Sequence, residues 1–124
     1  MPNQLNIFSK GYFYLYGIVI PFLLYAYIVN LIKTKKETVI SKQIVRSGTS
    51  IGANINEANY GQSKADMLSK FEIALKECSE TEGWLQLLFN TNSINEDIYK
   101  KNRNLCGRIR RMLISSCKTL KEKI

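Results

Sequence analysis

The last quarter of the chain gathers the side chains that could do chemistry, and most of them are cations. From Ile94 onward, nine lysines and arginines stand against three acidic residues, so this segment supplies most of the net charge of +8. Clustered ammonium and guanidinium groups attract phosphate. The predicted contacts to a backbone of RNA or DNA are Lys100, Arg103, Arg108, Arg110 and Arg111. Nothing in their spacing sets them up to read bases, and the alternative is a solvated helix face that binds nothing.

The residues that usually carry catalysis are sparse in this sequence. There is no histidine, so the commonest general base and metal ligand is missing. Glu57, Asp66, Ser79 and Glu82 have no base, metal or oxyanion donor at a diagnostic spacing. We therefore expect a protein that is not an enzyme, with no catalytic residue, no cofactor and no metal site.

Three cysteines, Cys78, Cys106 and Cys117, complete the set of reactive side chains. Their odd number and the lack of a Cys-x-x-Cys spacing favour neither a zinc site nor a disulfide framework. Cys106 and Cys117 are separated by about three helical turns, so they face the same way if both are helical. We predict that these cysteines are small buried residues of a reduced, cytoplasmic protein.

Helices must position these groups, and the most informative of them covers residues 37–59. Apolar and small residues recur there at three- and four-residue spacing, which is the period of one helix face. Gly48 and Gly52 lie on that face, although a glycine inside a helix costs roughly 1 kcal/mol relative to alanine. We expect them to let another helix approach closely. Asn54 and Glu57 are predicted to form a buried polar pair that fixes the register of this helix.

The same period predicts three further helices, over residues 21–36, 64–90 and 95–121. Glu82 alone interrupts the apolar series of the helix over residues 64–90. The inward face of the last helix is expected to hold Ile98, Leu105, Ile109, Met112, Ser116 and Leu120.

Short polar connections separate the predicted helices. Gly61 suits a left-handed residue at the end of one helix, and Ser63 offers an N-cap to the next. Long amphipathic helices joined by short loops predict an all-α fold, an antiparallel up-down-up-down four-helix bundle. We assign this domain to residues 21–124, and residues 1–20 to an apolar N-terminal extension.

The beginning of the chain leaves two interpretations open. Residues 11–32 contain no charged residue and are followed by Lys33, Lys35 and Lys36. That length and that flank are typical of a membrane-spanning helix. The alternative, which we favour, is that the extension packs on the bundle or on a neighbouring subunit.

One central block resembles the signature of a known family. The stretch VISKQIVRSGTSIGANINEA over residues 39–58 is similar to the signature of the bacterial four helix bundle protein family, first annotated from open reading frames within intervening sequences of 23S ribosomal RNA genes. Four shorter stretches match in order: IVNL at 28–31, GQSKAD at 61–66, IALKE at 73–77 and ETEGWL at 80–85. The resemblance covers roughly residues 26–123, whereas residues 1–25 lack the charges that family first helices usually carry.

The resemblance implies a four-helix bundle that assembles as a homopentameric ring. It also implies kinship with the basic accessory protein of diversity-generating retroelements, a pentamer that binds nucleic acid and a reverse transcriptase. For most of the family no biochemical activity is established.

Three hypotheses for function follow. The first is a non-catalytic oligomeric protein that binds RNA or DNA through the basic last helix. The second is a protein-interaction scaffold without nucleic acid, which would use the N-terminal extension and Trp84 as its partner surface. The third is a membrane-anchored bundle.

Overall fold

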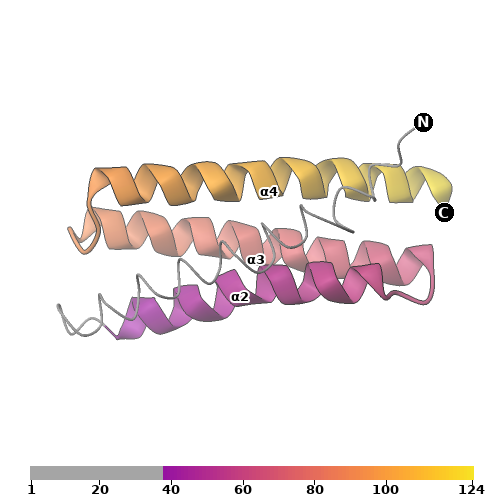
Figure 1. Ribbon diagram of the computed structural model, residues 1–124, viewed down its shortest axis with the longest axis horizontal. Coiled ribbons are helices and arrows are strands. Elements are labelled where there is room, and N and C mark those ends of the chain that lie inside the picture. The colour runs from indigo at the N-terminus through magenta and orange to yellow at the C-terminus, as the bar shows by residue number, and fades with distance from the viewer. Residues whose placement is uncertain (1–37) are drawn as a thin grey trace.

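In the computed structural model, residues 38–124 are described, and they form three helices and no strand. These helices are α2 (Val39–Asn59), α3 (Lys64–Asn90) and α4 (Glu96–Lys123). Figure 1 shows α3 lying between α2 and α4, with consecutive helices antiparallel. The all-α class is confirmed. The predicted helix over residues 21–36, the extension over residues 1–20 and the uncharged segment lie outside the described residues, so the bundle is seen here with three helices rather than four.

The starts of α3 and α4 follow from capping side chains. Ser63 Oγ accepts a hydrogen bond from the backbone N–H of Asp66 at 3.1 Å, and Asn95 Oδ1 accepts one from Ile98 at 2.8 Å. Each cap satisfies a backbone donor that has no partner within the first turn. Helix α4 also has acidic residues in its first turn and lysines in its last turn, which complement the helix dipole. The predicted limits of α3 are confirmed, and those of α4 agree within two residues.

The left-handed residue lies in a different loop from the one predicted. Among the described residues, Asn92 has a φ of 59°, and no glycine has a positive φ. The N–H groups of Asn92 and Ser93 donate to the carbonyls of Phe89 and Leu88 at 3.0 and 2.8 Å, the pattern of a Schellman motif at the end of α3. The prediction of a left-handed Gly61 is therefore wrong. A Cβ there would lie 3.1 Å from the carbonyl oxygen of Ala58, so this glycine serves a tight turn.

One hydrophobic core draws on all three helices. Gly48 and Gly52 are buried, which confirms that they lie on the inner face of α2. Between α2 and α3, the buried hydroxyl of Thr81 donates to Ser47 Oγ at 2.8 Å. The core side chains of α3 recur from its second turn to its last, and they include Phe71, Ala74, Cys78, Leu85 and Leu88.

The buried face of α4 is rotated from the predicted one. Ile109, Ser116 and Leu120 are buried as expected, whereas Ile98, Leu105 and Met112 are only partly buried. Their places in the core are taken by Tyr99, Cys106, Leu113 and Cys117. The tyrosine and the cysteines give a weaker apolar signal in the sequence than leucine or isoleucine, so the periodicity pointed to the adjacent stripe.

Within residues 38–124, no helix is both long and apolar enough to cross a membrane.

A candidate nucleic-acid interface

Four of the five predicted phosphate contacts come together in one place. Arginines of α4 line a shallow depression of about 390 Å³ beside α3. We call it the basic depression, and its lining residues are Glu82, Arg103, Asn104, Gly107, Arg108, Arg110 and Arg111. Among the described residues, four guanidinium groups therefore face one carboxylate.

Two of these arginines are held by neighbouring side chains. Arg110 Nε donates to Glu82 Oε1 at 3.1 Å, so α3 fixes one edge of this guanidinium. The guanidinium of Arg103 lies 5.3 Å from the centroid of the Tyr99 ring, a cation–π contact. Tyr99 in turn stacks on Phe89 with 4.5 Å between the ring centroids. Both arginines are thus oriented by residues that belong to, or lie beside, the core.

The other two arginines carry unmatched charge. Neither Arg108 nor Arg111 forms an ion pair with any of residues 38–124. The side chain of Arg111 instead turns back along its own helix, so that Nη1 lies 3.4 Å from the position that a Cβ on Gly107 would occupy. Both guanidiniums are exposed to solvent, and a group of like charges in one hollow attracts an anion.

Lys100, the fifth predicted contact, lies outside the basic depression. Its Nζ is 2.9 Å from Glu96 Oε1, and the adjacent Lys101 forms the same kind of contact with Asp97 at 3.1 Å. Each pair spans one turn of α4, so the charges at the start of the helix are locally balanced.

The predicted pair of Asn54 and Glu57 is not formed. The amide of Asn54 donates to the backbone carbonyl of Ser50 at 2.8 Å. The side chain of Glu57 is 56% exposed and lies 3.1 Å from Lys70 Nζ of α3. The carboxylate therefore reaches across to the next helix at the surface, which places an ion pair there instead of a buried polar pair.

The cysteines are buried, as predicted. Cys78 Sγ donates a hydrogen bond to the carbonyl oxygen of Cys106 at 3.3 Å, which links α3 to α4. The contact with Cys78, together with burial, raises the pKa of the Cys106 thiol far above its ordinary value. Burial also raises the pKa of Cys117. Because the thiolate is the reactive form, both of these thiols are poor nucleophiles. Among the described residues, no group of histidine, cysteine or acidic side chains is placed to hold a metal ion.

Two sets of ion pairs that join α3 to its neighbouring helices are only partly predictable from the sequence. Glu82 was singled out because it interrupts an apolar series, and the structure places it at the edge of the core, where it binds Arg110. Arg46 of α2 forms ion pairs with Glu77 and Glu80 of α3. The spacing of two acids by three residues on α3 is a signal for such a bridge, but the sequence does not say which helix supplies the cation.

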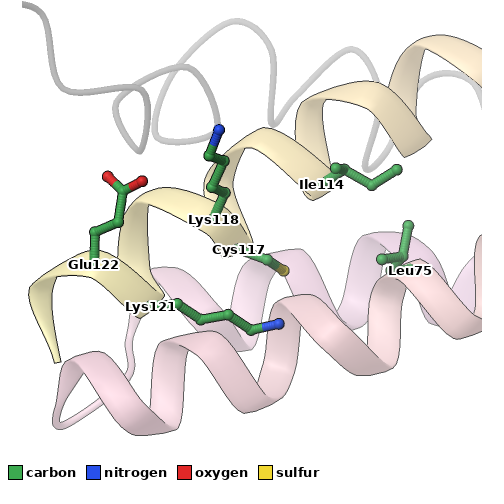
Figure 2. A pocket seen from close by; sticks show the side chains of 6 residues that line it. All are labelled: Leu75, Ile114, Cys117, Lys118, Lys121 and Glu122. Carbon is green, nitrogen blue, oxygen red and sulfur yellow. The ribbon is translucent and has the colours of Figure 1, made fainter.

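A second hollow lies farther along the same pair of helices, and it is apolar (Figure 2). Leu75 of α3 and Ile114 of α4 approach it from opposite sides, with Cys117 between the two helices. Lys118, Lys121 and Glu122 of α4 complete its lining, and Lys121 extends toward α3. Because Ile114 is 50% exposed, this hollow presents apolar surface to solvent.

Comparison with known proteins identifies one family and one solved structure that this chain resembles. The model of the 23S rRNA-intervening sequence protein family matches residues 22–115. A crystal structure of a protein of unknown function from the S23 ribosomal protein family of Bacteroides thetaiotaomicron is 44% identical, with a TM-score of 0.80 over 93% of this chain and 98% of that one. No match was found among curated proteins. On the extent of the family match, the chain belongs to the 23S rRNA-intervening sequence protein family.

Proposed function

We propose that this protein is a non-catalytic subunit that binds the phosphate backbone of RNA or DNA through the basic depression of α4. The observation that carries the proposal is the charge balance of that hollow, where, among residues 38–124, four arginines face the single carboxylate of Glu82. Arginine forms planar, two-nitrogen contacts with phosphate. The sequence contains no histidine and no metal-ligand motif, so we favour a binding protein over an enzyme. We expect it to act in the cytoplasm.

Contacts of this kind recognise charge and not base sequence. Phosphate contacts position a nucleic acid, whereas specificity needs groups that reach the base edges. The basic depression is shallow and lies on the side of a helix packed against α3, so we expect binding that depends strongly on salt and weakly on sequence.

Assembly would multiply these contacts. The family resemblance implies a four-helix bundle in a homopentameric ring, and the apolar hollow of Figure 2 supports self-association because it exposes Ile114. Five copies would convert weak individual contacts into useful avidity. Native mass measurement, with absorbance checked for bound nucleic acid, tests the subunit count, and a monomer would contradict the assembly.

The binding experiment compares two double variants that remove equal charge from the same helix. Arg108→Gln/Arg111→Gln removes the unmatched arginines, whereas Lys100→Gln/Lys101→Gln removes lysines already paired with acids. Fluorescence anisotropy with a single-stranded RNA 20-mer across a salt series gives the affinity and the salt slope. We expect the arginine variant to lose about a hundredfold in affinity, with a slope shallower by roughly 1.4.

The lysine variant is expected to bind within a few-fold of the wild type, because its charges are locally balanced. Binding that is absent at low salt, indifferent to salt, or equally weakened by both double variants would contradict the proposal.

A protein partner, such as a reverse transcriptase, is the second candidate function. The apolar hollow favours it, because Leu75 and Ile114 would be covered by a partner as readily as by another subunit. Capture of a protein that survives nuclease treatment and persists in the Arg108→Gln/Arg111→Gln variant would support this function.

A further inference from the structure

Gly107 occupies a place where the backbone does not require glycine. It lies in the middle of α4, and no glycine in residues 38–124 has a positive φ. Glycine is among the poorest helix formers, so its presence weakens the helix that carries the basic depression. A glycine at such a position usually makes room for something close to the backbone.

Two guanidinium groups lie closest to the space that a side chain at this position would occupy. A Cβ built on Gly107 would lie 3.4 Å from Arg111 Nη1 and 3.8 Å from Arg110 Nη2. Both distances are ordinary contacts, so alanine would fit without displacing the backbone, but its methyl group would stand against the two guanidiniums. Gly61 and Gly83 differ from it, because a Cβ on Gly61 would lie closest to backbone atoms and one on Gly83 would meet open space.

The orientation of Arg110 adds a second constraint. Glu82 binds its Nε edge at 3.1 Å, while Nη2 lies over Gly107. The carboxylate thus holds the Nε edge of the guanidinium, while Nη2 of Arg110 and Nη1 of Arg111 both lie within 4 Å of the position that a Cβ on Gly107 would occupy. Two like charges brought together in this way are stabilised when an anion lies between them.

We propose that Gly107, Arg110 and Arg111 form a seat for one phosphate oxyanion, with the bare Cα of Gly107 as its floor. This deepens the proposed function and rests on it, since it assigns one contact of the basic depression to a defined place. The shared chemistry is a phosphate group, which a nucleic-acid backbone or free inorganic phosphate could supply.

The seat predicts that stability and binding change in opposite directions at one residue. In Gly107→Ala the helix gains a better helix former, so the melting temperature should rise. The methyl group should fill the floor of the seat and lower the affinity for the RNA 20-mer about tenfold, the loss of one hydrogen bond to a charged group. The salt slope should become shallower by roughly 0.7, which corresponds to one contact on a single strand.

Gly83→Ala is the matched control, because its Cβ meets nothing within 4 Å. It should raise the melting temperature and leave RNA binding unchanged. Arg111→Lys is the second test variant, since it keeps the charge and loses the planar pair of nitrogens. It should reproduce the loss of affinity even if Gly107→Ala does not fold.

A parallel titration with inorganic phosphate at constant ionic strength identifies the source of the anion. A loss confined to RNA assigns the seat to a backbone phosphate, and a loss seen with inorganic phosphate assigns it to the free ion. If Gly107→Ala and Arg111→Lys bind both probes like the wild type, the seat is overturned. The proposed function would then stand or fall separately on the Arg108→Gln/Arg111→Gln variant.

Discussion

Two arginine-containing sites flank α3, and they differ in how their charge is balanced. On the α2 side, one guanidinium, that of Arg46, lies between two carboxylates: Nη1 is 3.2 Å from Glu77, and Nη2 bonds to Glu80. The indole N–H of Trp84 also donates to Glu80 at 3.2 Å. On the α4 side, four arginines line the basic depression, and Glu82 is the one acidic residue that lines it within the described part of the chain.

The difference separates a structural use of arginine from a binding use. At Arg46 the acidic residues outnumber the cation, so the site ties α2 to α3 and has no positive charge left for a phosphate. The hydrogen bond from Arg46 accordingly holds the pKa of Glu80 below its ordinary value. In the basic depression the cations outnumber the acid, and the excess charge is available to a ligand. The residue type alone does not distinguish the two sites, whereas the count of neighbouring carboxylates does.

The largest loss of stability is expected in the core of α3, because this helix carries acidic residues of both arginine sites. Leu85 of α3 is buried, with 1% of its surface exposed. Leu85→Ala should lower the free energy of unfolding by about 2–5 kcal/mol, through lost burial and the cavity left behind. Chemical denaturation measures this change. If the variant remained as stable as the wild type, α3 would not be the common scaffold of the two sites.

A smaller loss is expected between α2 and α3, on the Arg46 side alone. Thr81→Val removes the hydroxyl that donates to Ser47 Oγ and leaves that buried oxygen with only its longer contact, at 3.4 Å, to the carbonyl of Ile44. We expect a cost of about 1–3 kcal/mol and unchanged RNA affinity. Ser47→Ala/Thr81→Val, which removes both hydroxyls, should cost less than the two single changes added together. A fall in RNA affinity in the single variant would show that the two sides of α3 are not independent.

Much of this fold follows from local signals in the sequence. Ser63 as an N-cap, the limits of α3 and the buried face around Gly48 and Gly52 all depend on short-range periodicity and capping, and they were predicted. The left-handed residue is the exception: the sequence predicts it at Gly61 after α2, whereas the structure has it at Asn92 after α3. Asparagine also tolerates the left-handed conformation, so the sequence alone does not distinguish Asn92 from Gly61 as the residue that adopts it.

The candidate site was less predictable because it depends on how helices face each other. The sequence grouped Lys100 with the arginines by charge, but local pairing with Glu96 and a different position along α4 separate it from them. Likewise, the spacing of Asn54 and Glu57 suggested a buried pair, whereas Lys70 on the next helix draws the carboxylate to the surface. The proposed role of Gly107 depends on where the guanidiniums of Arg110 and Arg111 lie in space, and the residue pattern of the sequence does not give those positions.

The contrast between the two sites also predicts a dependence on pH. Because Arg46 lowers the pKa of Glu80 in the folded protein, this ion pair stabilises the fold at pH values above the ordinary pKa of the carboxyl. The contribution is lost as the pH falls through the lowered folded-state value. The difference in melting temperature between wild type and Glu80→Gln should therefore be present at pH 7 and should shrink below pH 4.5, the ordinary value for this group. Glu72→Gln is the matched control, and an unchanged difference at low pH would contradict the role of the pair.

The smallest effect is expected at Lys100, at the start of α4. Its Nζ pairs with Glu96 one turn earlier, and both side chains are largely exposed. Exposed pairs of this spacing contribute about 0.3–0.5 kcal/mol, so Lys100→Gln should change the free energy of unfolding by no more than that. RNA affinity should stay within twofold of the wild type, because the residue lies outside the basic depression. A loss as large as that of Arg111→Lys would instead extend the interface to the first turns of α4. The deciding feature would then be the total charge of the helix, and not the balance of cations and carboxylates around each arginine.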